Sequence, residues 1–203
     1  MKNILFTVCM ISVIATSCIS TQITSSWSQP NKTVVLDNLH RVLVVAMFKT
    51  EVNRRRAEDQ MIGYLNGKGV VSYNYLDANF NKQNEDAIRK KIKTDGFDAA
   101  VTMRLMNVDK ENVYTPGITS TYPLGYRNFS GYYYRAWGFS ETPGYYTTSK
   151  TYTVEVNVFS IKEEKIVWTG ITQSIDPKGI NKMTAEIVKV IYKKMKNDGF
   201  ISK

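Results

Sequence analysis

The sequence predicts an α/β fold: a single domain over residues 34–203, with a mixed sheet of about five strands and three helices packed on both of its faces. The first observation is that apolar stretches of strand length alternate along the chain with longer stretches of helical periodicity. The second is that each predicted helix is followed by a glycine, Gly67, Gly96 or Gly199, the residue that most easily adopts the left-handed conformation ending a helix. Strands and helices that alternate in this way form one layered domain.

The spacing of apolar residues predicts the individual elements. Residues 41–48 are apolar on both faces, as expected for a central strand, whereas residues 152–161 alternate strictly and form a hairpin with the next strand. In the first helix, Ala57, Met61 and Leu65 recur at four-residue steps. In chain order, the predicted elements are strand 41–48, helix 51–66, strand 70–76, helix 82–95, strand 97–106, strands 152–161 and 166–175, and helix 179–197.

The order of these elements also predicts a topology. Connections between parallel strands through a helix are right-handed in nearly all proteins. If strand 41–48 lies between strands 70–76 and 97–106, the helices 51–66 and 82–95 therefore fall on opposite faces of the sheet. The uninterrupted apolar character of strand 41–48 favours this arrangement.

The first 17 residues are typical of an export signal, because Lys2 precedes an apolar stretch that is shorter than the roughly 20 residues of a membrane-spanning helix. The stretch ends in Ala15-Thr16-Ser17-Cys18, which resembles the lipobox of bacterial lipoproteins. The resemblance implies cleavage after residues 1–17, diacylglycerol on the Cys18 thiol and palmitate as a further acyl chain, so that the protein meets the membrane through lipid. The alternative is an ordinary signal peptide with a cysteine nearby.

The residues after the lipobox predict where the protein lies. In this class of lipoprotein an Asp after the cysteine signals retention in the inner membrane, and the residue here is Ile19. We therefore expect an envelope protein anchored to the outer membrane and facing the periplasm. Residues 18–33 are rich in Ser, Thr, Asn and Gln and are expected to be a tether between lipid and domain.

Composition argues against several classes of function. The net charge is +9, but an exported protein does not meet nucleic acid, so no nucleic-acid partner is expected. Cys9 leaves with the signal and Cys18 carries lipid, so no disulfide or cysteine metal site remains. His40 is the single histidine, and no Gly-x-Ser-x-Gly motif accompanies it. We therefore expect no metal, no cofactor and no enzymatic activity.

An aromatic-rich insert over residues 109–150 interrupts the pattern of strands and helices. Eleven of the 33 residues from Tyr114 to Tyr146 are aromatic, and tyrosine suits recognition surfaces and glycan platforms. The insert leaves the carboxyl end of strand 97–106, where open α/β sheets place ligands; alternatively, its rings pack on their own domain. The candidate binding residues are Tyr114, Tyr126, Tyr132, Tyr133, Tyr134, Trp137, Phe139, Tyr145 and Tyr146.

Several short segments resemble a widespread family of bacterial lipoproteins whose domain has no assigned activity. They are Thr24-Ser25-Ser26-Trp27, Val42-Leu43-Val44-Val45-Ala46, Gly96-Phe97-Asp98-Ala99, Tyr114-Thr115-Pro116-Gly117, Gly144-Tyr145-Tyr146 and Ile166-Val167-Trp168-Thr169-Gly170. More distantly, the order of strands and helices is similar to the anticodon-binding-like α/β domains of the Tol-Pal propeller protein, the curli-secretion lipoprotein and the lipoprotein activators of penicillin-binding proteins. That resemblance implies a binding or assembly module.

We therefore expect a cell-envelope lipoprotein that acts as a non-enzymatic binding or assembly module, with its aromatic insert contacting an envelope protein or a glycan. One alternative is a subunit of an oligomeric envelope or secretion assembly, with the insert at the subunit contacts. Another is an enzyme whose site the sequence does not reveal. Oligomeric state, pathway and the identity of the partner stay open.

Overall fold

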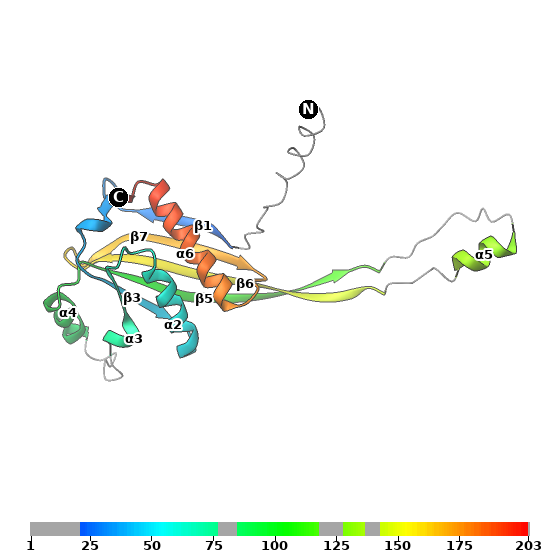
Figure 1. Cartoon of the computed structure of the whole chain (residues 1–203), viewed down its shortest axis with the longest axis horizontal. Coiled ribbons are helices and arrows are strands. Elements are labelled where there is room, and N and C mark those ends of the chain that lie inside the picture. Colours follow the sequence, from blue (N-terminus) through cyan, green and yellow to red (C-terminus); the bar gives the residue numbers. More distant parts are fainter. Residues whose placement is uncertain (1–20, 77–84, 118–127, 137–142, 203) are drawn as a thin grey trace, which may run out of the picture.

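The computed structural model describes residues 21–76, 85–117, 128–136 and 143–202, which form an α/β domain built on a mixed sheet (Figure 1). In chain order its elements are β1 (Thr21–Ser28), β2 (Val34–Val35), η1 (Leu36–Asn38), β3 (Val42–Met47), α2 (Glu51–Ile62), β4 (Gly69–Val71), α3 (Ser72–Tyr75), α4 (Glu85–Thr94), β5 (Ala99–Thr115), α5 (Phe129–Ala136), β6 (Tyr145–Ser160), β7 (Lys165–Ile175), α6 (Ile180–Asn197) and β8 (Ile201–Ser202). Six strands form the main sheet in the order β1-β7-β6-β5-β3-β4, and β2 pairs with β8 separately.

The predicted fold class and topology are confirmed. β3 lies between β4 and β5 and is parallel to both. Ala57 and Met61 of α2 pack in the main core on one face of the sheet, and Ile92 of α4 packs in a second cluster on the other face. The sheet has six strands rather than about five, and the described residues include five α-helices rather than three because the short helices α3 and α5 were not expected.

The main core lies between the sheet and the helices α2 and α6. The indole of Trp168 in β7 is fully buried in this core, together with a stripe of α6 residues at helical spacing. A Cβ atom at Gly170 would lie 2.3 Å from Cη2 of Trp168, so glycine leaves the room that this ring occupies. The buried stripe of α6 consists of Met183, Thr184, Ile187, Val188, Ile191 and Met195.

The three glycines predicted to end helices have the expected left-handed backbone. Their φ angles are 74° at Gly67, 73° at Gly96 and 72° at Gly199. The helix expected over residues 51–66 ends earlier, at Ile62, and its last part is a turn that closes at Gly67. The glycine therefore marks where the chain reverses toward the next strand rather than the last helical turn.

The tether expected over residues 18–33 does not include residues 21–28, which form the edge strand β1 of the sheet. β1 is antiparallel to β7, and the hydroxyl groups of Thr21 and Ser174 lie 2.7 Å apart. The Thr21 hydroxyl also donates to the carboxylate of Glu186 in α6 at 3.0 Å. An edge strand contacts the core through one face, so its mostly polar sequence is compatible with pairing.

The strand predicted over residues 70–76 is wrong in its second half, where the chain turns into α3. The cause is the fully buried carboxylate of Glu58 in α2, which accepts the backbone N–H of Ser72 at 2.6 Å and that of Tyr73 at 3.3 Å. The same carboxylate accepts the backbone N–H of Ala46 at 3.0 Å. Because these donors lie on two other segments, Glu58 joins α2 to β3 and to the start of α3.

The flanks of the insert expected over residues 109–150 are continuations of two sheet strands. β5 extends to Thr115, β6 begins at Tyr145, and the two strands stay paired with each other over this whole length. They project from the sheet as a two-stranded ribbon, with α5 at its far end (Figure 1). We call the ribbon of residues 109–115 and 145–151, together with α5, the arm.

Candidate functional site

The arm leaves the sheet at a base that is braced by hydrogen bonds. Asp176 follows β7 and accepts the backbone N–H of Lys150 at 2.7 Å and the hydroxyl of Ser149 at 2.8 Å. Hydrogen bonds from the Lys150 backbone and the Ser149 hydroxyl lower the pKa of Asp176, so that the carboxylate stays charged at neutral pH. The brace therefore holds the first residues of the ribbon against the end of β7.

The distal part of the arm exposes aromatic rings. Tyr114 and Tyr146 lie opposite each other on the two strands, with ring centroids 4.9 Å apart, and Tyr145 lies on the other face of the ribbon. In α5, the rings of Phe129 and Tyr133 are 5.8 Å apart. The exposed fraction of these five residues ranges from 54% for Tyr114 to 77% for Phe129. A group of exposed rings on one projecting element is a candidate contact surface.

Charge falls along the arm as aromatic content rises. The base carries Asp109, Lys110, Glu111 and Lys150, whereas residues 112–117 and 143–149 contain no charged side chain. A two-stranded ribbon is marginally stable by itself in water. The distal ribbon therefore combines an uncharged, aromatic surface with a position outside both core clusters, which makes it a candidate contact surface.

The structure brings together some of the predicted binding residues. Tyr114, Tyr145 and Tyr146 lie on the ribbon and Tyr133 lies on α5, all in the arm. The backbones of Tyr132 and Tyr134 belong to α5 as well. The remaining predicted site residues lie outside the described residues; they are Tyr126, Trp137, Phe139 and Cys18, the predicted site of lipidation.

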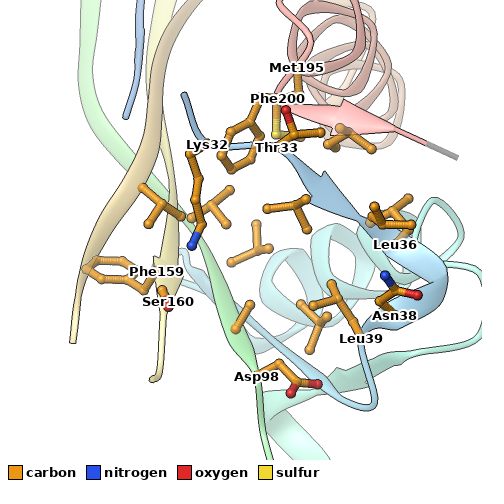
Figure 2. A pocket seen from close by; sticks show the side chains of 18 of the residues that line it. Lys32, Thr33, Leu36, Asn38, Leu39, Asp98, Phe159, Ser160, Met195 and Phe200 are labelled. Carbon is orange, nitrogen blue, oxygen red and sulfur yellow. The ribbon is translucent and has the colours of Figure 1, made fainter. Parts of the chain in front are cut away.

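A second candidate site, which the sequence analysis missed, lies at the opposite end of the sheet. It is a cavity of about 360 Å³ beneath residues 32–39, a segment that contains β2 and η1 and that we call the strap (Figure 2). The cavity is bounded by the strap, by the sheet ends away from the arm and by the end of α6, which are far apart in the sequence. Its apolar wall includes Leu39, Val42, Val101, Val158, Met195 and Phe200.

Charged groups at the rim of the cavity hold the strap in place. Lys32 of the strap pairs with Glu163, and Lys165 lies 3.0 Å from the same carboxylate. Hydrogen bonds from Lys32 and then Lys165 lower the pKa of Glu163 to about 2. Burial favours a raised pKa at Asp98, but the backbone N–H of His40, 2.5 Å away, contributes to a net lowering of that pKa. Both carboxylates are therefore engaged with the protein itself.

Three further observations bear on other kinds of site. His40, the single histidine, is exposed, and its Nδ1 lies 3.6 Å from the carboxylate of Asp98. Within the described ranges, no group of three or more His, Cys, Asp or Glu side chains is arranged to hold a metal ion. Among the helices that the structure describes, none is long and apolar enough to cross a membrane.

Comparisons with known proteins give distant likenesses in structure. No protein-family model matches the sequence, and no curated protein is significantly similar to it. A PelC dodecamer from Paraburkholderia phytofirmans has a TM-score of 0.46 at 8% identity, covering 85% of this chain and 95% of that one. The lipoprotein GNA1162 from Neisseria meningitidis has a TM-score of 0.39 at 12% identity, covering 77% of this chain and 98% of that one. Likenesses at this level do not assign a function.

Proposed function

We propose that the protein is a lipid-anchored, non-enzymatic module of the cell envelope and that the arm is its binding element. One observation carries the proposal: the arm holds aromatic rings that are more than half exposed on an element outside both core clusters. An envelope protein or a glycan is the kind of partner that such a surface contacts through stacking and hydroxyl groups.

The energetics support a contact on the arm. Complete burial of one large apolar side chain contributes roughly 1.5–3 kcal/mol relative to exposure. The exposed rings of Tyr114, Phe129, Tyr145 and Tyr146 forgo much of this free energy in the isolated chain. A partner that covers several of them at once recovers it, and also stabilises the ribbon between them.

The anchor belongs to the same proposal and rests on the sequence around Cys18. Acylation of this residue places the domain at a membrane surface, and Ile19 favours the periplasmic face of the outer membrane. Because β1 begins at Thr21, the domain follows the lipid after a very short connection. The arm then acts close to the membrane.

A subunit role in an oligomeric envelope or secretion assembly is the second candidate, and the shape of the ribbon favours it. Tyr114 and Tyr146 lie on one face of the ribbon, and Val113 and Tyr145 lie on the other. Neighbouring copies in a ring would cover both faces. Light scattering of the detergent-solubilised protein tests this role, since a monomer at high concentration argues against it.

Crosslinking in cells tests the binding role of the arm. A photoreactive phenylalanine derivative replaces Tyr146 in the arm or, as the matched control, Val52, an exposed apolar residue of α2. We expect crosslinked species from position 146 and not from position 52. A second variant lacks residues 111–149 and joins Lys110 to Lys150, which lie opposite each other in the ribbon, through an Asn-Gly turn. This variant should lose the partners that the full-length protein binds. An unchanged set of partners argues against the proposal.

A further inference from the structure

We infer that the surface covering the distal arm is the bilayer that carries the lipid of Cys18, and that the aromatic ribbon lies in the interfacial layer of this bilayer. The inference rests on the proposed lipid anchor. It takes the membrane surface, in place of a protein or a glycan, as what the arm contacts, and the experiment below decides between these partners. It follows from where the arm leaves the sheet, how far it reaches and how its polarity changes along its length.

The lipidated end of the chain and the arm leave the sheet at the same edge. In the strand register, Thr21 of β1 lies opposite Ser174, Ser174 lies opposite Tyr152, and Tyr152 lies opposite Val108. These four residues form one row across β1, β7, β6 and β5. The first residue of β1 and the first residue pair of the arm therefore lie on the same side of the domain (Figure 1).

The arm reaches farther from this row than the connection to the lipid can. Residue 18 precedes Thr21 by three residues, which span at most about 11 Å when fully extended. Thr115 lies seven residues beyond Val108 on β5, which corresponds to about 23 Å along a strand. When the acyl chains are in the membrane and the row faces it, the distal ribbon reaches the membrane surface, and an arm inclined to that surface lies within its outer layer.

The polarity of the arm fits this placement. Residues 112–149 include three charged residues, Arg127, Arg135 and Glu141, and no lysine, although charged residues make up 22% of the chain. Tyrosine rings are enriched where membranes meet water, because the ring is apolar and the hydroxyl stays hydrated. The charged base at Asp109 and Lys150 then remains in water while Tyr114 and Tyr146 reach the head-group region.

Two features of the ribbon favour an interfacial layer of lipid over one flat protein surface. Aromatic rings lie on both faces, with Tyr146 on one and Tyr145 on the other, and a flat partner covers one face. Lipid head groups surround both faces. The two outer edges of a two-stranded ribbon carry unpaired backbone groups, which is costly in the hydrocarbon core, so the ribbon stays at the depth where water is present.

A cysteine-labelling experiment tests the inference on the full-length lipidated protein. Once the signal is removed, Cys18 is the one native cysteine and its thiol is acylated in the proposed protein, so an introduced cysteine takes an environment-sensitive fluorophore at one site. The variants are Tyr146→Cys and Tyr145→Cys on the two faces of the arm. The matched control is Lys162→Cys, an exposed position at the end of the sheet opposite the arm.

In phosphatidylcholine vesicles that contain nitroxide-labelled lipid, we expect a blue shift and a loss of emission at positions 145 and 146, and neither change at position 162. Vesicle-bound, acylated protein whose labels at 145 and 146 escape quenching overturns the inference and leaves the lipid anchor standing. A blue shift there without lipid quenching assigns the arm to a protein contact and likewise overturns it. An amino terminus without acyl mass removes the anchor itself, and the inference with it.

Discussion

Apolar side chains are exposed at one end of the sheet and buried at the other. At the arm end, β5 and β6 run on without neighbours and leave Tyr146 75% exposed. At the cavity end, the strap covers the strand ends, and Phe200 is 2% exposed. β5 and β6 contribute to both ends, so the difference lies in what packs beside them, which at the cavity end includes β3, β7, the strap and α6. Stability should therefore depend on the cavity end and the core, and contact with other molecules on the arm end.

Truncation of a wall residue at the cavity end should cause the largest loss of stability. Phe200→Ala removes a buried ring beside Trp168, with centroids 6.5 Å apart, and should lower the free energy of unfolding by about 3–5 kcal/mol. Tyr146→Ala at the arm end should lower it by less than about 1 kcal/mol. Urea unfolding measures both, and equal losses would show that the arm belongs to the core.

Replacement of a glycine by alanine should lower stability in the sheet and raise it in the arm. Gly170→Ala places a methyl group against the Trp168 ring and should cost about 1–3 kcal/mol through overpacking. Gly131→Ala in α5 should favour the helix by about 0.5–1 kcal/mol. Among the described residues its new methyl group meets the end of the Asn128 side chain at 3.1 Å, and this side chain can shift by the few tenths of an ångström required. Thermal unfolding reports the first change and proteolytic protection of the arm reports the second. Destabilisation by both substitutions would contradict the comparison.

Removal of the brace at the base of the arm should change local opening more than global stability. Asp176→Ala removes the acceptor of two hydrogen bonds, each of which contributes roughly 0.5–1.5 kcal/mol when well formed. Hydrogen exchange at Lys150 should become faster, while the unfolding midpoint should move little. Asp86→Ala, at an exposed position of α4, serves as the control and should leave exchange in the arm unchanged.

The smallest expected effect is a pH dependence at the cavity end. The pKa of Glu163 is about 2 in the folded protein and 4.5 ordinarily, so its pairing with Lys32 stabilises the strap above about pH 4.5. That contribution should disappear as the pH falls from 4.5 toward 2. The difference in unfolding free energy between the wild type and Lys32→Gln should therefore shrink over this range. A difference that stays constant from pH 5 to pH 2 would show that the pair does not hold the strap.

Much of the fold is predictable because it is encoded by local patterns. The apolar run of residues 42–47 identifies β3 as a central strand, and this position places α2 and α4 on opposite faces. The positive φ angles at Gly67, Gly96 and Gly199 follow from the placement of a glycine just after a helical pattern. β1 is different, because an edge strand rich in serine and threonine has the composition of a linker, and only its pairing with β7 makes it a strand.

The candidate site, like the fold, is predictable from the sequence only in part. Composition identifies the aromatic segment and its tyrosines, since eleven of the 33 residues from Tyr114 to Tyr146 are aromatic, against 12% of the whole chain. Composition does not predict that the flanks of this segment continue β5 and β6, because strand pairing depends on partners 30 or more residues apart. The cavity left no signal in the sequence, since residues from five or more separate elements line it.

The sequence by itself determines the layered α/β class, the central strand, the helix ends and the aromatic residues of the arm, and it predicts an export signal that ends at a cysteine. The tertiary structure decides that Thr21 and the base of the arm share one row of the sheet, that Glu58 turns the chain into α3, and that the strap encloses a cavity. The physical reason is the separation along the chain of the residues that interact. Periodicity and backbone preference act over a few residues, whereas register, buried polar contacts and enclosure depend on which distant segments pack together.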